Sequence, residues 1–308
     1  MKNPETLLEA VRYFANERDA WTCVVNRRWP DGIVICPRCG SSKVRLVESR
    51  MIWNCKDCVR QFSAKIETIF EESPLPFSKW LPAMWLIANA KNGVSSCEVA
   101  RALGVTQKTA WFMLHRIRLA FDAGTIEKLS GHVESDETFV GGLESNKHPY
   151  RKTGQGRGSV GKTVVWGAIQ REGRVVANVV ADTKAVTLRS EVFGHVERGS
   201  TLYTDAHGGY FGMHSTFAHQ VIDHAVSYVE GQVHTNSIEN FWSLLKRTIK
   251  GTYVSVEPFH LFRYLDEQVW RFNEREQTDS QRFLRALAQV VGKHITYAEL
   301  TGKELVLA

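Results

Sequence analysis

The spacing of apolar side chains predicts helices in the first 120 residues of the chain. Residues 4–17 carry apolar side chains at helical intervals. A second helical pattern runs from Trp80 to Arg118 and is interrupted at Asn92-Gly93 and again at Gly104. Because three short helices separated by tight turns are typical of a helix-turn-helix, we expect one over residues 76–122.

Stretches rich in β-forming residues replace the helical pattern after His132. The β-rich stretches are residues 132–140, 162–170, 174–181 and 201–205. Helical patterns follow at residues 185–198, 235–250 and 258–275. Strands followed by an alternation of strand and helix predict an α/β domain. Residues 141–161 are glycine-rich, basic and without periodicity, which predicts a mobile loop.

The composition is that of a folded, soluble protein. Hydrophobic residues make up 43% of the 308 residues and charged residues 23%. No run of about 18 uninterrupted apolar residues is present, and the first twenty residues carry charges throughout, so we expect a cytoplasmic protein. The net charge of +6 and the pI near 9.0 favour an anionic partner.

Four of the six cysteines form two close pairs, Cys36-Pro-Arg-Cys39 and Cys55-Lys-Asp-Cys58, with fifteen residues between them. Two residues between ligands let a tight turn present two thiolates to one tetrahedral ion. This paired spacing predicts a zinc ribbon over residues 31–66. Four thiolates would fill the coordination shell of Zn²⁺, so a structural ion is expected. A redox C-x-x-C motif would explain only one of the two pairs.

Polar residues of the last predicted helix in the helix-turn-helix are candidates for DNA contact. Gln107 and Lys108 fall in its first turn, where a recognition helix meets base edges. His115 and Arg116 fall on or near the face opposite its apolar residues. A plain helical hairpin with solvated basic residues is the other interpretation.

Two further groups of basic residues suit contact with phosphates. One lies in the predicted loop and includes Arg151, Lys152 and Arg157. The other is Lys246 with Arg247. Both are candidate DNA-binding residues.

Three acids are candidates for phosphodiester chemistry, which can use two divalent ions about 3.5 to 4 Å apart, held by carboxylates from separate elements. Asp136 lies inside the strand-like run 132–140, Asp205 ends the run 201–205, and Glu239 lies in the helical run after Thr235. A carboxylate at the carboxyl end of a buried strand is placed where α/β sheets bind ligands. These three acids are therefore the candidate catalytic and metal-binding residues.

Neighbouring side chains compete for these roles. Glu137 is adjacent to Asp136, and strand alternation points it to the other face. His207 and His234 are also potential ligands, although a histidine beside a loop more often serves as a hydrogen-bonding residue. Lys246 follows Glu239 by seven residues, almost two turns along one helix face, where it would meet backbone phosphate.

Longer motifs resemble those of a known family. They are Arg28-Trp-Pro-Asp-Gly32 before the first cysteine pair, Gly104-Val-Thr-Gln-Lys-Thr-Ala-Trp-Phe-Met-Leu-His-Arg-Ile-Arg118, Asp136-Glu-Thr-Phe-Val-Gly-Gly142, Tyr203-Thr-Asp205, His234-Thr-Asn-Ser-Ile-Glu-Asn-Phe-Trp-Ser-Leu-Leu-Lys-Arg247 and Gly251-Thr-Tyr253. With them the chain resembles, over nearly its full length, the ISXO-like DDE transposases of bacterial insertion sequences.

The resemblance implies a ribonuclease-H-like α/β catalytic domain over residues 131–280, preceded by the zinc ribbon and the helix-turn-helix. Residues 1–30 would be an N-terminal helical segment, and residues 281–308 a C-terminal extension. The implied acidic triad is Asp136 on the first strand, Asp205 at the end of the fourth, and Glu239 on a following helix. Mg²⁺ or Mn²⁺ is the implied cofactor.

The resemblance also implies partners. They are double-stranded DNA, as terminal inverted repeats and target, and further copies of the chain in a homodimer or larger assembly on DNA. Such a protein would be associated with the bacterial nucleoid.

Together these features favour a DNA transposase that cleaves and transfers strands with two metal ions. A non-catalytic DNA-binding regulator is the alternative, and it leaves the carboxylates unexplained. A zinc-ribbon nuclease of nucleic-acid repair would share the chemistry and differ only in its products.

Overall fold

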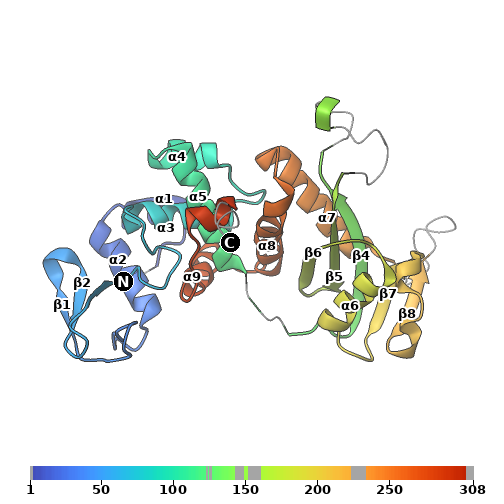
Figure 1. The fold of residues 1–308 in the computed structure, drawn as a ribbon, viewed down its shortest axis with the longest axis horizontal. Helices are drawn as coiled ribbons and strands as arrows, with labels where there is room; N and C mark the ends of the chain where they lie inside the picture. Colours follow the sequence, from blue (N-terminus) through green and yellow to red (C-terminus); the bar gives the residue numbers. More distant parts are fainter. Residues whose placement is uncertain are drawn as a thin grey trace. The chain divides into compact units, whose positions relative to one another are not determined.

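The computed structural model describes residues 3–122, 124, 127–142, 149–151, 161–222 and 234–302. The chain divides into two compact units, and most of their elements are labelled in Figure 1. Unit 1 is Met1–Asp122 together with Glu276–Ala308, and unit 2 is Ala123–Arg275. In the described part of the chain, no helix has both the length and the apolarity needed to cross a membrane.

Unit 1 is helical except for one small sheet. Its elements are α1 (Leu7–Phe14), α2 (Glu17–Arg28), β1 (Val44–Val47), β2 (Ile52–Cys55), β3 (Gln61–Ser63), α3 (Phe77–Asn89), α4 (Ser96–Leu103), α5 (Gln107–Phe121), α9 (Asp279–Ala288) and α10 (Tyr297–Thr301). The apolar helix α3 is buried along most of its length, and its Trp85 ring contacts Phe283 of α9. The C-terminal helices thus share a core with the N-terminal ones.

The short sheet of unit 1 has the order β1-β2-β3, with antiparallel pairing throughout. Its inner face carries Trp53 and Phe62, whose rings are stacked at 5.6 Å between centroids. Trp21 of α2 also stacks on Trp53, at 5.2 Å between ring centroids. These buried aromatic contacts fix the sheet against α2.

The helices α4 and α5 both begin at a side-chain cap. Ser95 and Glu98 form a reciprocal capping box at the start of α4, and Gly104 ends that helix with a φ of 63°. The Thr106 hydroxyl accepts a hydrogen bond from the Thr109 N–H and so caps α5. The predicted turn between the two helices is therefore present.

Unit 2 is built on a five-stranded sheet with the order β6-β5-β4-β7-β8. The strands are β4 (His132–Val140), β5 (Thr163–Gln170), β6 (Val175–Val180), β7 (Thr201–Asp205) and β8 (Ala218–Ile222). The central strand β4 pairs antiparallel with β5 and parallel with β7. Counted along unit 2, the strand order is 3-2-1-4-5, as expected for a ribonuclease-H-like fold.

Helices cover both faces of this sheet (Figure 1). Helix α6 (Ala185–His195) buries Leu188 and Val192 against one face. Helices α7 (Asn236–Thr248) and α8 (Leu261–Asn273) cover the other face with residues that include Phe241. A π-helical turn, Ile249–Tyr253, follows α7.

Candidate active site and metal centre

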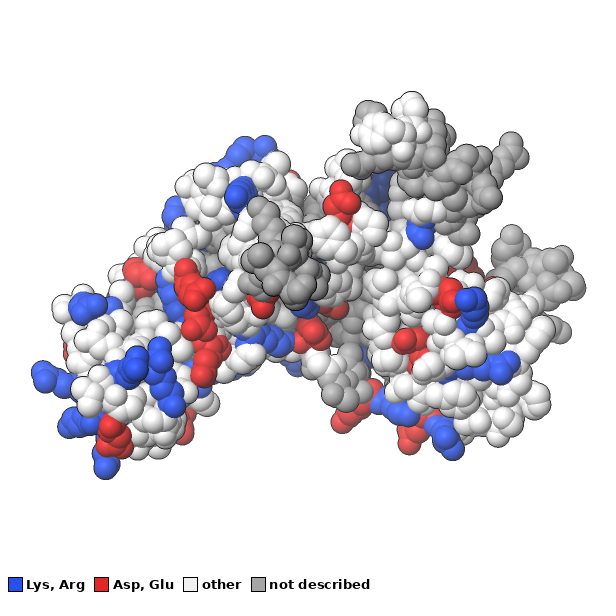
Figure 2. Space-filling view, in the orientation of Figure 1, with Lys and Arg blue, Asp and Glu red and all other residues white. Residues whose placement is uncertain are grey.

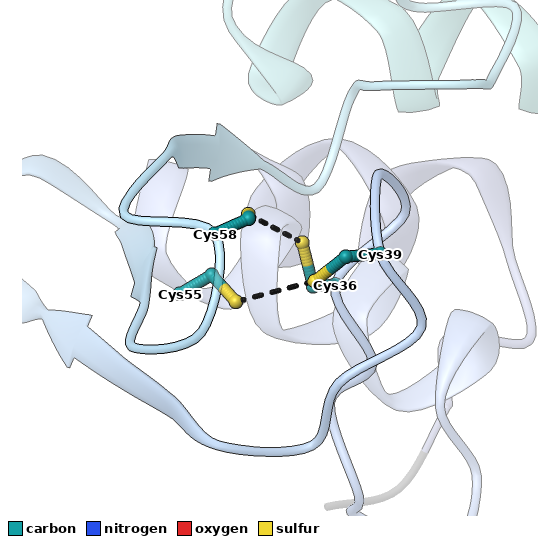
Figure 3. A group of neighbouring side chains, drawn as sticks. All are labelled: Cys36, Cys39, Cys55 and Cys58. Atoms are coloured by element: carbon teal, nitrogen blue, oxygen red, sulfur yellow. Dashed lines mark hydrogen bonds between the residues drawn. The ribbon is translucent and has the colours of Figure 1, made fainter.

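The four cysteine sulfurs of unit 1 come together as the sequence predicts (Figure 3). All four lie within 4.8 Å of one another, with Cys36 Sγ 3.7 Å from Cys58 Sγ and Cys39 Sγ 3.6 Å from Cys55 Sγ. A tetrahedral zinc ion with Zn–S bonds of about 2.3 Å places its sulfurs about 3.8 Å apart. The donor set and its spacing therefore fit one Zn²⁺.

The backbone of the second turn favours the thiolate form. Hydrogen bonding from the backbone N–H of Cys58, aided by that of Asp57, lowers the pKa of the Cys55 thiol to about 7. A metal ligand must be deprotonated, so these N–H groups prepare Cys55 for an ion.

In unit 2 the sheet register brings Asp136 and Asp205 together. The parallel strands β4 and β7 pair Glu134 with Tyr203, so two residues further on Asp136 and Asp205 stand at the same level on the same face. The backbone N–H of His207 donates to Asp205 Oδ1 at 3.0 Å, which fixes one carboxylate oxygen. Two acids predicted from separate segments therefore lie side by side.

Burial and repulsion perturb Asp136. Burial, together with the carboxylates of Glu137 and Asp205, raises the pKa of Asp136 to about 7. Only the charged form is penalised by these surroundings, and a bound cation would remove the penalty. A carboxylate in this condition is typical of a functional site.

A tryptophan of α7 reaches Asp136 because the strand beside it has a glycine. Trp242 Nε1 donates to Asp136 Oδ2 at 2.9 Å. Gly167 of β5 is the register partner of Asp136, and a Cβ there would lie 2.6 Å from the Trp242 ring. The missing side chain lets the indole lie on the sheet, where it orients the Asp136 carboxylate.

The third predicted acid, Glu239, lies on α7 three residues before Trp242, and is therefore on the same side of the helix. It is exposed, and its Oε1 accepts a hydrogen bond from Thr235 Oγ1 at 2.8 Å. Among the described residues, only the four cysteines form a group of three or more potential ligands within 4.8 Å. The three acids do not form one in this structure.

A buried carboxylate anchors the start of α7. Glu134 has no exposed surface, and its Oε2 accepts from the backbone N–H of Ser237 at 2.8 Å and of Ile238 at 3.1 Å. Its Oε1 accepts from Arg171 Nε at 2.8 Å and lies 3.2 Å from His234 Nδ1. Glu134 thus caps the helix that carries Glu239, although sequence reasoning assigned it no role.

Glu137 belongs to the same acidic region despite the alternation that was expected to separate it from Asp136. The hydroxyl of Tyr210 donates to Glu137 Oε2 at 2.8 Å, and His207 Nδ1 lies 3.5 Å from Glu137 Oε1. Burial raises the pKa of Glu137, and the charge of Asp205 raises it further.

Two of the predicted DNA-contact residues on α5 were placed wrongly. His115 is 1% exposed and Arg116 is 3% exposed. The Arg116 guanidinium donates to the backbone carbonyls of Ile69 and Glu71, and its Nε donates to that of Ile295 at 3.1 Å. Both residues belong to the interior of unit 1. Segments distant in sequence cover the face of α5 that its apolar periodicity predicted to be exposed.

The first turn of α5 agrees better with the prediction. Gln107 and Lys108 are exposed, with Gln107 Nε2 donating to Ser96 Oγ at 2.8 Å and Lys108 Nζ 4.6 Å above the Tyr297 ring. On α7, Lys246 and Arg247 are exposed as well.

The remaining candidates come from the predicted loop. Lys152 and Arg157 lie outside the described residues, as does the side chain of Arg151.

Two family models match the chain. Residues 128–273 match the ISXO2-like transposase domain, and residues 15–61 match the transposase zinc-ribbon domain. The first match covers the whole sheet of unit 2 with its acids, and the second includes all four cysteines. The fold and these matches define a DDE transposase with an N-terminal zinc ribbon.

Related proteins agree with this class. A protein in transposable element ISH50 of Halobacterium salinarum is 28% identical over 252 residues, which are 77% of this chain and 84% of the relative. A transposase-like protein of Haemophilus influenzae is 30% identical over 117 residues, 38% of this chain and 94% of the relative. The chain belongs to the ISXO2-like transposase family.

Proposed function

We propose that this chain cleaves DNA at the terminal inverted repeats of an insertion sequence and joins the freed ends to target DNA. The observation that carries the proposal is the pair Asp136 and Asp205, placed side by side at the carboxyl end of β7, with the pKa of Asp136 raised to about 7. A surface position without function would not require a buried carboxylate beside two others.

Each acid has a distinct place in the proposed mechanism. Asp136, Asp205 and Glu239 would hold two Mg²⁺ or Mn²⁺ ions, which when bound supply an activated nucleophile and stabilise the leaving oxygen. Trp242 orients Asp136, and the His207 N–H orients Asp205. The carboxylate donors suit these hard ions. Glu239 completes the set from α7, whose start Glu134 fixes.

The remaining parts would bind DNA. Gln107 and Lys108 would contact base edges from the first turn of α5, and Lys246 and Arg247 would contact phosphates beside the acids. Zn²⁺ at the four cysteines would stabilise the ribbon. Because two element ends must be brought together, a homodimer or larger assembly on DNA is part of the proposal.

The decisive experiment uses purified protein, Mg²⁺ and a labelled duplex that carries the repeat flanking the gene. We expect nicking at the repeat end and joined products with the intact chain. Asp205→Ala should abolish nicking and joining and leave DNA binding in place. Glu197→Ala, which removes an exposed acid of the same unit, is the control and should leave nicking and joining unchanged.

Three results would contradict the proposal. Cleavage retained by Asp205→Ala would refute the assignment of the acids. Binding by the intact chain without cleavage, in Mg²⁺ and in Mn²⁺ alike, would favour the DNA-binding regulator. Cleavage without joined products would point to a nuclease.

A further inference from the structure

The outer face of the zinc-ribbon sheet carries a row of side chains that no part of the fold uses. The register pairs Arg45 of β1 with Asn54 of β2, and Asn54 with Gln61 of β3. The three side chains therefore stand next to one another across the sheet, on the face opposite Trp53 and Phe62. Arg45 and Gln61 are exposed and Asn54 is half-buried.

These three side chains make no hydrogen bond or ion pair with any other residue that the structure describes. Their chemistry is specific: arginine donates two hydrogen bonds to guanine, and asparagine and glutamine each pair in the same two-point manner with adenine. Neighbouring strands are about 4.8 Å apart, so the row spans about 10 Å. The major groove of DNA is about 12 Å wide.

The charges around this row favour a polyanion. Residues 31–63 expose six basic side chains, Arg38, Lys43, Arg45, Arg50, Lys56 and Arg60, against three acids, Asp31, Glu48 and Asp57. Within the described residues, Lys43 is the one member of the six that forms an ion pair, to Asp57 at 3.7 Å. Figure 2 shows Lys and Arg side chains gathered over the region of β1 and β2, on the left of the view.

Basic residues also continue the outer face itself. Lys43 directly precedes β1 and Lys56 directly follows β2, and the Lys56 N–H donates to the Lys43 carbonyl at 2.9 Å, which extends the register of the two strands by one pair. Alternation places both lysines on the outer face, next to the row. No acid occupies the outer positions of β1, β2 or β3.

We propose that this face is a sequence-reading DNA surface, in which Arg45, Asn54 and Gln61 bind base edges in the major groove. Lys56, with its neighbours on the cysteine turns, binds the flanking phosphates. The ribbon thus contacts the terminal repeat at base pairs separate from those that meet α5. This assignment rests on the proposed function for its partner, double-stranded DNA.

Binding measurements can test the surface apart from catalysis. Fluorescence anisotropy of the full chain, without Mg²⁺ and without chelator, gives the affinity for the terminal-repeat duplex and for a scrambled duplex of the same composition. We expect Asn54→Ala to lower the ratio of the two affinities roughly 5- to 150-fold, the range of one two-point base contact. Its affinity for the scrambled duplex should stay within twofold of the wild-type value.

Two further variants complete the set. Lys56→Ala should weaken binding to both duplexes alike and reduce the slope of log affinity against log salt by about 1. Gln220→Ala, which removes an exposed amide side chain from β8 in unit 2, is the matched control and should change neither quantity. One zinc per chain in each variant shows that the ribbon is folded.

An unchanged affinity ratio in Asn54→Ala and in Arg45→Ala overturns this inference, as does an intact chain that binds both duplexes equally. The proposed function is judged separately, by whether the intact chain cleaves and joins the repeat. If the intact chain cleaves and the ribbon variants keep the wild-type ratio of affinities for the two duplexes, only the sequence-reading DNA surface is refuted. A chain that discriminates but never cleaves would refute the transposase proposal alone.

Discussion

Replacing Glu134 by glutamine is expected to loosen the start of helix α7. The carboxylate is fully buried and accepts hydrogen bonds from Arg171, Ser237 and Ile238. Glutamine has the same shape and keeps one acceptor oxygen for the helix N–H groups. Its NH₂ group would face the Arg171 guanidinium, donor against donor, and leave that cation without its buried partner.

The size of the effect follows from these contacts. Breaking a buried ion pair by removing one partner costs about 3–5 kcal/mol. Because glutamine keeps one acceptor, we expect the free energy of opening α7 to fall by about 2–4 kcal/mol. Amide hydrogen exchange in α7 should then become about 30- to 1000-fold faster.

Hydrogen exchange of the full chain measures this directly, because it reports on α7 separately from unit 1. Glu197→Gln, a neutralisation at an exposed position of unit 2, is the matched control and should leave the exchange of α7 unchanged. If exchange in α7 of Glu134→Gln stays within threefold of the wild-type rate, the anchoring role of Glu134 is refuted.

Four other changes test the structure. Gly167→Ala should displace the Trp242 ring, since the new Cβ would lie 2.6 Å from it, and slow strand cleavage about 100-fold in the gel assay; an unchanged rate would show that Trp242 does not orient Asp136. In metal-free protein the pKa of Asp136, about 7 when folded against 3.8 ordinarily, means that the folded state binds this proton more tightly. The stability that this group contributes is therefore present below about pH 4 and is lost as the pH rises to about 7, a fall of roughly 4 kcal/mol in the free energy of unfolding. Urea unfolding of Asp136→Asn should lack that fall. Identical pH profiles for the variant and the intact chain would count against the shift. Arg116→Met should destabilise unit 1 by about 2–4 kcal/mol, because it leaves buried carbonyls without donors; a stable variant with weakened DNA binding would restore the original surface assignment. Removal of zinc should unfold β1–β3 and expose Trp53, seen as a red shift in fluorescence, and a metal-free protein with unchanged spectrum would refute the structural role of the ion.

The sequence predicted those elements whose pattern is local. Strand β4 was predicted as a β-rich run with the bounds that the structure has, and α4 and α5 are separated at Gly104, where the sequence predicted a break. The cysteine site was predicted because the spacing of the two pairs is itself the signal. Asp205 was found because it ends a strand-like run, the position at which α/β sheets bind ligands.

Two elements without an amphipathic pattern were predicted less well: α2 falls within the predicted helical segment 1–30 but was given no bounds of its own, and β8 was not predicted. Helix α2 has almost no separation of apolar and polar faces, and it is the Asn16 cap that separates it from α1. Strand β8 lies at the edge of the sheet and is mostly exposed, so it lacks the apolar residues that mark a buried strand.

The wrong placement of His115 and Arg116 has a different origin. Periodicity identifies one apolar face of a helix and assigns the other face to solvent. In unit 1 the second face of α5 is covered by segments that include Ile69 and Ile295, one of them almost 180 residues away in the chain. The role of Glu134 was hidden for the same reason, since its partners on α7 are about 100 residues further on.

The return of the chain to unit 1 after Arg275 makes unit 2, with the candidate acids, an insertion within unit 1. During synthesis, unit 2 can fold as soon as its own residues have emerged, whereas α3 must wait for Phe283 to cover its Trp85. A gene copy truncated before codon 276 would therefore lose part of the core at its N-terminal end as well. Point mutations in α9 are expected to affect DNA binding, although this helix lies 158 residues beyond the end of α5.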